Sequence, residues 1–265
     1  MYKAKIDNLD LKQIADSGQC FRWKNTGENE YTIVAFDKAI KITQDGNEFS
    51  FDCDEDEWNS VWRDYLDMDT DYVGIAKLIA DGTDEHLKEA YAYGSGVRIL
   101  KQDLWEMIVT FMISQNNNIK RITNSVDLLC SRCGRPIEGH EGMYTFPKPG
   151  EVADEVFEDR SMGFGYRASY LKEIYSYGLH NPDWLDKLRK MSYDEAMTSL
   201  LERKGIGKKV ANCICLFGLH HVDAFPIDTH VKQLLDKYYS DGFDFERYNG
   251  VAGIIQQYLF YFELQ

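Results

Sequence analysis

The stretch ERKGIGKKVANCICLFGLHHVDAFPIDTH (residues 202–230) determines how the C-terminal part of this chain is expected to fold. Two glycines, Gly205 and Gly207, follow a segment with helical period, and an apolar run with helical period comes after them. A dinucleotide-binding turn would need a preceding strand and a third glycine, but Val210 stands in that place. The stretch therefore predicts a helix–hairpin–helix unit over residues 192–219, with Gly-Ile-Gly as its turn.

The hairpin turn has two interpretations. Gly205 and Gly207 can turn the chain tightly and leave backbone N–H groups bare at the start of the second helix, where such groups bind phosphate oxygens. Lys204 and Lys208 would then add ionic contacts. The alternative is an ordinary helix–turn–helix with a glycine cap and solvated lysines, and the local pattern alone favours this alternative.

Lys209 has a distinct position on the second helix. It lies four residues before Cys213, so the two side chains share one helix face. The apolar stripe of the helix is separate and consists of Val210, Ile214 and Phe217. An amine in the first turn of a helix, with Lys208 beside it, can have a lowered proton affinity and act as a nucleophile.

Asp228 follows Pro226 and precedes another segment with helical period. Aspartate is a common helix N-cap, which accounts for the residue without any further function. Because a capping carboxylate is held in one geometry, the capping role and a role in chemistry are compatible.

The charge of the chain is unevenly distributed. The formal net charge is −14, which argues against a polyanionic partner. Residues 52–71 hold nine acids and one base, whereas residues 201–212 hold one acid and four bases. Since a binding face depends on local charge, the acidic total lowers the expectation of nucleic-acid binding without excluding it. The acidic run is expected to be a solvated helix face that points away from any DNA.

Composition predicts a cytoplasmic protein without disulfides. No apolar run approaches the roughly 20 residues that span a bilayer, and the N-terminus lacks a signal-peptide core. Six cysteines in 265 residues do not indicate a disulfide scaffold. Only Cys130 and Cys133 have metal-ligand spacing, with His140 nearby, and two ordinary thiols are favoured over zinc because no second pair exists. No cysteine cluster lies near the C-terminus, so no iron–sulfur cluster is expected there.

The chain divides into a β-rich first part and a helical second part. Alternating aromatic and β-branched runs predict an antiparallel meander with a tight turn at Asp45-Gly46. After a short helix at 9–15, the expected strands are 20–24, 30–36, 39–44 and 48–52. Helices are expected at 55–66, 70–80, 84–93, 103–115, 118–133, 150–158, 167–177, 192–203, 208–219, 229–239 and 245–262. With a boundary in 94–99, the fold class is α+β, with domains 1–98 and 99–265.

Six blocks together resemble the helix–hairpin–helix (HhH-GPD) DNA glycosylase superfamily, and within it the 8-oxoguanine DNA glycosylases. The blocks are SGQCFRW (17–23), SQNNNIKRIT (114–123), MGFGYRASY (162–170), KGIGKKVANCICL (204–216), FPIDTHV (225–231) and AGIIQQYLF (252–260). They run nearly end to end, in the order of the family. The resemblance implies a TBP-like N-terminal antiparallel β-sheet domain packed on a larger all-helical HhH-GPD domain. It also implies a bifunctional glycosylase and AP lyase that excises 8-oxoguanine, paired with cytosine, in base excision repair.

The resemblance also implies roles for single residues. Lys209 would be the nucleophile that forms a Schiff base, and Asp228 would stabilise positive charge on the sugar. The implied damaged-base pocket consists of Gly18, Cys213, Gln256, Phe260 and His230. The carbonyl of Gly18 would accept from N7–H of 8-oxoguanine and reject guanine, whose N7 is an acceptor. The implied contacts to the opposite cytosine and the wedge are Asn116, Arg121, Tyr166 and Arg167. The implied DNA-phosphate contacts are Gly205, Gly207 and Lys208.

The implied partner is damaged double-stranded DNA, bound by a monomer without a membrane and without a required cofactor. From the resemblance alone, a monovalent cation is expected at the backbone carbonyls of Leu201, Arg203 and Ile206. In a bacterium the protein would associate with the nucleoid. Three alternatives remain open at this point: a related glycosylase for alkylated or oxidised pyrimidine bases, a non-catalytic HhH DNA-binding protein, and a protein-interaction scaffold. Against the pyrimidine enzymes stands the lack of the four-cysteine cluster that is typical of them.

Overall fold

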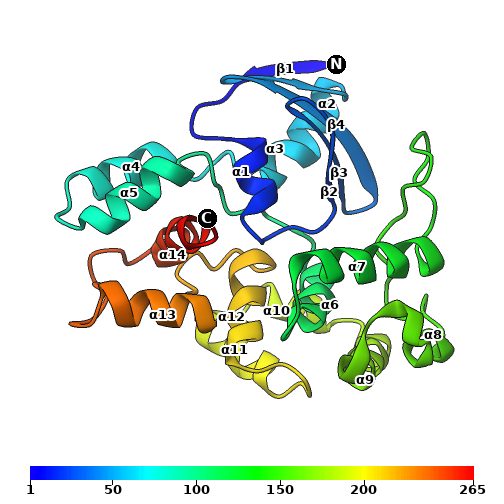
Figure 1. Ribbon diagram of the computed structural model, residues 1–265. Helices are drawn as coiled ribbons and strands as arrows, with labels where there is room; N and C mark the ends of the chain where they lie inside the picture. Colours follow the sequence, from blue (N-terminus) through cyan, green and yellow to red (C-terminus); the bar gives the residue numbers. More distant parts are fainter.

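A computed structural model describes residues 1–265 and shows a five-stranded antiparallel sheet at one end of the molecule, with helices forming the rest (Figure 1). The strand order is β1-β5-β4-β3-β2. The strands are β1 (Tyr2–Lys5), β2 (Trp23–Gly27), β3 (Glu30–Ala35), β4 (Lys38–Asp45) and β5 (Glu48–Phe51). The α+β class is confirmed. The strand expected at 20–24 starts only at Trp23, and β1 is an additional edge strand, whose sequence YKAK alternates in burial but was not predicted as a strand.

The hairpin between β4 and β5 forms where Asp45-Gly46 predicts it. Asp45 pairs with Glu48, and Gly46 has a φ of 61°, a left-handed conformation that glycine adopts without strain. Alternation along the strands then directs one set of side chains into a core of the sheet, which includes Tyr31, Ile33, Ile40, Ile42, Phe49 and Phe51.

Two helical segments pack on this sheet and complete its core. The first is α1 (Leu11–Asp16), capped by the side chain of Asp10. The second is predicted as one helix over 55–66 but consists of α2 (Glu55–Glu57), the π-helical turn η1 (Trp58–Trp62) and α3 (Arg63–Tyr65). Their buried side chains in the sheet core are Leu11, Ile14, Trp58, Trp62 and Tyr65. The aromatic side chains of 58–65 face the sheet, which leaves the acids of this segment on the outside.

The larger unit consists of helices around one core of 50 buried residues. Its helices from α4 to α9 are α4 (Tyr72–Ala80), α5 (Glu85–Gly94), α6 (Leu104–Ser114), α7 (Ile119–Cys133), α8 (Asp154–Glu158) and α9 (Ala168–His180). The remaining ones are α10 (Trp184–Leu188), α11 (Tyr193–Leu201), α12 (Lys208–Phe217), α13 (Thr229–Tyr238) and α14 (Ala252–Glu263). Helix α10 is additional to those predicted. The helix expected at 245–262 starts only at Ala252, because Gly250 has a φ of 88° and interrupts it.

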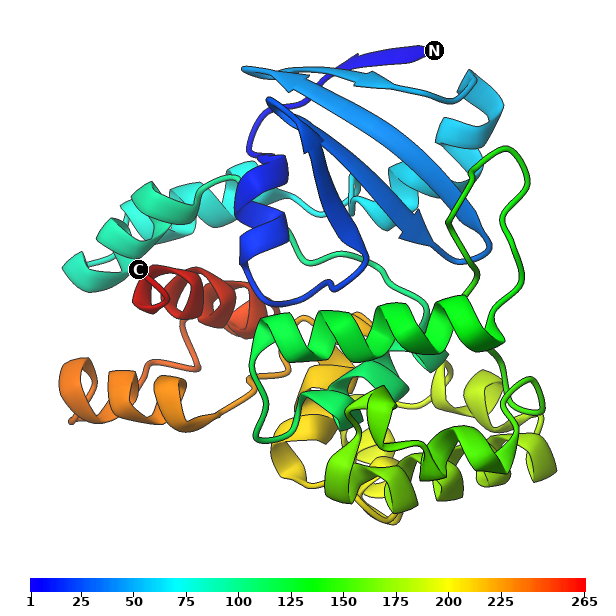
Figure 2. The ribbon, with the colours of Figure 1, turned by 45° about the vertical axis from the view of Figure 1, so that its right-hand side comes forward.

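The packing divides the chain differently from the domain boundary predicted at residue 98. Helices α4 and α5 precede this boundary, yet their buried side chains, such as Ile75, Ile79 and Leu87, belong to the core of the helical unit. Figures 1 and 2 show α5 lying along the C-terminal helix α14. The core of the sheet unit contains no residue between Leu66 and Leu100. Leu100 belongs to it although this residue follows the predicted boundary. The cause is tertiary: α5 packs against α14, which comes at the other end of the sequence, and α4 packs against α5.

A buried ion pair joins the two units. The guanidinium of Arg22, from the sheet unit, donates to the carboxylate of Glu106 on α6 at 3.0 Å. Burial raises the pKa of Glu106, and the charge of Arg22 only partly opposes this effect. No helix of the chain combines the length and the apolar character needed to cross a membrane.

Candidate functional site

The predicted hairpin is formed by α11 and α12, and the predicted capping box opens it. The Ser192 side chain accepts from the Glu195 N–H, and the Glu195 side chain accepts from the Ser192 N–H. Between the helices, Gly205 has a φ of 85°, and its carbonyl accepts from the amide of Gln115 at 2.9 Å. Gly207 is the N-cap of α12 and supplies no side-chain cap. The first N–H groups of α12 are therefore bare, as in the phosphate-binding interpretation.

The two hairpin glycines give opposite expectations for substitution. A Cβ on Gly205 would lie 2.5 Å from the ring of Tyr170, whereas a Cβ on Gly207 would have nothing within 4 Å. The left-handed backbone and the overlap together predict that Gly205→Ala lowers the free energy of unfolding by about 2–4 kcal/mol. Gly207→Ala is the matched control and should change it by less than about 1 kcal/mol. Chemical denaturation of both variants checks this, and equal stabilities would contradict the role given to Gly205.

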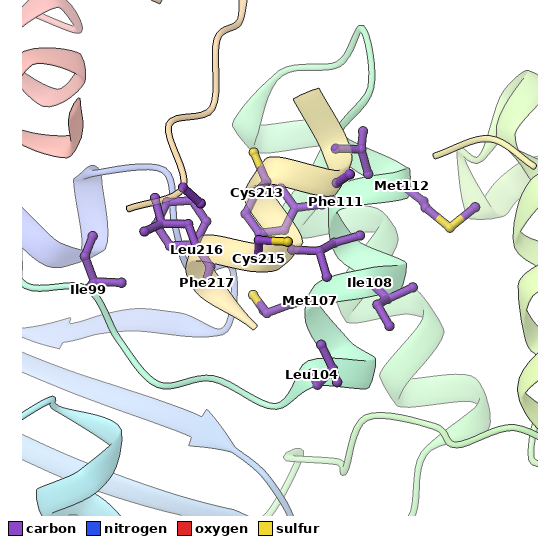
Figure 3. Packing of buried hydrophobic residues seen from close by; sticks show 14 of the residues in the cluster. Ile99, Leu104, Met107, Ile108, Phe111, Met112, Cys213, Cys215, Leu216 and Phe217 are labelled. Carbon is purple, nitrogen blue, oxygen red and sulfur yellow. The ribbon is translucent and has the colours of Figure 1, made fainter. Parts of the chain in front are cut away.

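Lys209 lies in the first turn of α12 and is partly buried beside aromatic side chains. Its Nζ is 5.6 Å from the centroid of the Phe111 ring on α6. That ring stacks on Phe217 of α12 at 5.4 Å between centroids. Figure 3 shows Phe111 close to Cys213 and α6 packed against α12. The amine is thus held at the edge of the core, apart from the apolar stripe, as the spacing predicts.

Asp228 caps α13, as its position after Pro226 predicts. Its carboxylate accepts from the Val231 N–H at 2.9 Å, which fixes the orientation of the side chain. Asp228 and Lys209 line the same cavity. The structure therefore places a fixed carboxylate and an amine at one site.

This cavity contains most of the residues predicted for the base pocket. Gly18, Cys213, Gln256 and Phe260 line it together with Lys209 and Asp228, and its volume is about 40 Å³. The amide oxygen of Gln256 is buried and has no hydrogen-bond partner. A buried acceptor without a partner is costly, so a ligand that brings N–H donors would be favoured here.

Cys213 is a neutral wall of the cavity at physiological pH. Burial raises the pKa of its thiol, and the adjacent Lys209 lowers it by less. The thiol is therefore protonated and does not compete with Lys209 as a nucleophile.

A wide groove continues from the cavity. Its volume is about 1400 Å³, and it contains Asn116, Arg121, Tyr166 and His230 together with the cavity residues Gly18, Lys209, Asp228 and Phe260. Gly207 and Lys208 line it as well, whereas Gly205 does not. His230 lies in the groove and not in the cavity that was predicted to include it. Tyr166 is 54% exposed, as a side chain that inserts into another molecule must be.

Arg167, like Gly205, is a predicted site residue that lines neither the cavity nor the groove. Its guanidinium is buried and donates to the carbonyls of Gln115, Asn116 (3.0 Å) and Phe164 (3.3 Å). The carbonyls of Gln115 and Asn116 turn inward because Asn116 has a φ of 45° and breaks the chain direction after α6. In this conformation Arg167 supports the loop that carries Asn116 and also stacks on Tyr166. A contact between Arg167 and a cytosine would require another side-chain conformation, and this role stays a prediction.

The groove is basic although the chain is acidic. Its lining contains five basic residues, Lys120, Arg121, Lys208, Lys209 and Lys232, and one acidic residue, Asp228. No residue of the acidic run 52–71 lines it. Lys204 is paired with Glu173 at 3.1 Å and lies outside it. The local charge therefore suits a polyanion in spite of the overall −14.

Five residues of the cavity were not predicted from the sequence: Ser17, Phe111, Phe217, Pro226 and Gln257. In the sequence, the two phenylalanines cannot be distinguished from ordinary core residues, to which they also belong. Gln257 directly follows Gln256 on α14. The orientation of this helix in the fold, which the sequence does not show, places both residues at the cavity.

A hairpin that presents bare N–H groups, a lysine at the start of its second helix and a fixed carboxylate, all in a basic groove, defines the class of helix–hairpin–helix DNA glycosylases. The comparisons with known proteins agree. The family model described as "8-oxoguanine DNA glycosylase, N-terminal domain" matches residues 1–108. The N-glycosylase/DNA lyase OGG1 of Arabidopsis thaliana is 34% identical over 87% of this chain and 66% of its own length.

Two further relatives extend the likeness. The N-glycosylase/DNA lyase of Saccharomyces cerevisiae is 35% identical over 87% of this chain and 68% of its own length, so the chain spans about two thirds of the curated relatives. The solved 8-oxoguanine glycosylase/lyase of Clostridium acetobutylicum, bound to double-stranded DNA with cytosine opposite 8-oxoG, is 32% identical. Its TM-score is 0.88, with 97% of this chain and 92% of that one covered. The chain belongs to the 8-oxoguanine DNA glycosylase family.

Proposed function

We propose that this protein is a bifunctional DNA glycosylase and AP lyase that excises 8-oxoguanine paired with cytosine from duplex DNA, in base excision repair. The observation that carries the proposal is the single cavity that joins Lys209 and Asp228 to the unpartnered amide oxygen of Gln256. The names of the relatives support the same activity.

The reaction begins when the damaged nucleotide leaves the stack, because its C1′ atom is not accessible inside a duplex. The free amine of Lys209 attacks C1′, and the glycosidic C–N bond breaks with its electron pair going to the base. Asp228 stabilises the positive charge that develops on the sugar and helps to remove the proton of the amine. Opening of the sugar ring gives a Schiff base between Lys209 and C1′. Loss of a proton from C2′ then expels the 3′ phosphate by β-elimination.

Base recognition follows from the donors and acceptors in the cavity. The Watson–Crick edge of a guanine carries N–H donors, and the buried oxygen of Gln256 lacks a donor. Cys213 and Phe260 lie on the walls, where they can contact the two faces of a flat base. The carbonyl of Gly18 is assigned to N7–H, the donor that 8-oxoguanine has and guanine lacks.

On the side of the cytosine, the loop after α6 and the first turn of α7 provide polar donors. Asn116 and Arg121 line the groove and can reach the acceptors O2 and N3 of a cytosine. Tyr166 is placed to wedge into the space that the flipped base leaves. Gly207 and Lys208, at the bare N-terminus of α12, are assigned to phosphate.

The protein acts as a monomer, without a membrane partner and without a required cofactor, in the cytoplasm, at the nucleoid if the organism is bacterial. A monovalent cation at the carbonyls of Leu201, Arg203 and Ile206 fits the open end of α11, where the last carbonyls have no intrahelical partner. The Arg203 carbonyl already accepts from the Ile206 N–H at 3.1 Å, so it would share its second lone pair with the ion.

The direct test is strand incision of duplexes with one 8-oxoguanine opposite each of the four bases, beside the undamaged duplex. We expect incision with cytosine opposite the lesion and at least about ten-fold less with adenine, since an adenine lacks the acceptor pattern that Arg121 meets. The undamaged duplex should remain intact. Incision of alkylated or oxidised-pyrimidine duplexes in place of the 8-oxoguanine duplex would favour a related glycosylase. DNA binding without any incision would favour a non-catalytic protein.

A further inference from the structure

The turn that carries Gly18 is held by a side chain from the opposite end of the chain. Gln257, on α14, donates from its amide nitrogen to the carbonyl of Ser17 at 2.5 Å. Gln257 is 2% exposed, and Ser17 is fully buried. The neighbouring Gln256 lines the cavity, and its amide oxygen is buried without a hydrogen-bond partner. The two adjacent glutamines therefore have separate functions, because successive residues of a helix point in directions about 100° apart.

The other side of the same turn is held by Gln19. Its amide nitrogen donates to the Ser17 hydroxyl at 2.9 Å and to the Arg98 carbonyl at 2.8 Å, while its oxygen accepts from the Leu100 N–H at 2.9 Å. The carbonyl of Gln19 accepts from the side chain of Gln102 at 2.8 Å. All these bonds are buried, so water cannot replace them easily.

These bonds hold the chain on both sides of Gly18. A peptide unit is planar, so the bond from Gln257 to the Ser17 carbonyl also fixes the nitrogen of Gly18. The side-chain bonds of Gln19 hold the Cα at the far end of the peptide that contains the Gly18 carbonyl. Gly18 itself has a φ of 75° and no Cβ to restrict it. Without the two side-chain bonds, its carbonyl could rotate at small cost.

We propose that Gln257 is a positioning residue that fixes the direction of the Gly18 carbonyl, and that the discrimination between 8-oxoguanine and guanine depends on it. This inference rests on the proposed function. A fixed carbonyl accepts from N7–H of 8-oxoguanine and faces the acceptor N7 of guanine, which it repels. A carbonyl that rotates away loses the bond with 8-oxoguanine and no longer repels guanine. Both changes reduce the difference in affinity between the two bases.

The test uses Gln257→Leu, which leaves the Ser17 carbonyl unpaired, with Tyr258→Phe as the matched control. Tyr258 is the next residue of α14, fully buried, and its hydroxyl has no hydrogen-bond partner. Affinities for duplexes containing 8-oxoguanine or guanine opposite cytosine are measured in the Lys209→Gln background, so that no substrate is consumed. We expect the ratio of the two affinities to fall about ten-fold with Gln257→Leu and to stay unchanged with Tyr258→Phe.

A second measurement separates positioning from a general loss of structure. With Lys209 present, cleavage of a duplex that already contains an abasic site needs no base in the pocket. Gln257→Leu should therefore keep this rate within about two-fold while excision of 8-oxoguanine falls about ten-fold. If Gln257→Leu does not fold, Gln257→Glu has the same shape and, when ionised, lacks the donor.

The outcomes are distinguishable. An unchanged affinity ratio in a folded Gln257 variant overturns the inference, as does an equal fall in excision and abasic-site cleavage, which indicates a merely structural role. If the parent protein does not prefer the 8-oxoguanine duplex to the guanine duplex, the proposed function itself fails and the inference fails with it.

Discussion

Replacing Lys209 by glutamine is expected to lower single-turnover excision of 8-oxoguanine by at least about a thousand-fold, because the variant has no amine to attack C1′. Binding should persist, since the groove keeps its other four basic residues. Excision is measured by release of the free base and by strand cleavage in parallel, because both depend on the same amine.

Lys208→Gln is the matched control for Lys209→Gln. Lys208 is the preceding residue, is exposed on α12 and lines the groove but not the cavity. Its loss should weaken DNA binding and reduce the salt dependence of binding, with the excision rate at saturating protein unchanged. If the Lys208 variant loses catalysis and the Lys209 variant keeps it, the assignment of the nucleophile is wrong.

Two substitutions of Asp228 are expected to separate its cap from its chemistry. Asparagine is as good an N-cap as aspartate, so Asp228→Asn should leave the stability of α13 nearly unchanged, whereas Asp228→Ala should cost about 1 kcal/mol. Both lack the negative charge, so both should lower the excision rate by about 100-fold. The measurements are thermal unfolding and single-turnover excision. Full activity of Asp228→Asn would show that Asp228 is only a cap.

The local part of the site could be predicted from the sequence. The Gly-Ile-Gly turn, the capping box at Ser192 and the cap at Asp228 all depend on residues a few positions apart, and the structure has them where the sequence indicates. The same holds for the face shared by Lys209 and Cys213, which four-residue spacing alone decides.

The remaining features depend on contacts between distant segments. The burial of Arg167 requires three carbonyls to converge, and the left-handed backbone of Asn116 that turns two of them inward has no sequence signature of its own. The bond from Gln257 to Ser17 joins residues 240 positions apart. The assignment of α5 to the helical core depends on its packing against α14 in the same way, and α4 follows through its packing against α5.

The central claim is that the amine of Lys209 becomes covalently bound to the sugar of an excised 8-oxoguanine. Borohydride reduction during the reaction with an 8-oxoguanine:cytosine duplex tests it most directly, followed by proteolysis and mass spectrometry of the cross-linked peptide. The account predicts a stable protein–DNA adduct on Lys209, absent with Lys209→Gln and absent with undamaged DNA. No adduct in the active parent protein, or an adduct on another residue, would contradict it.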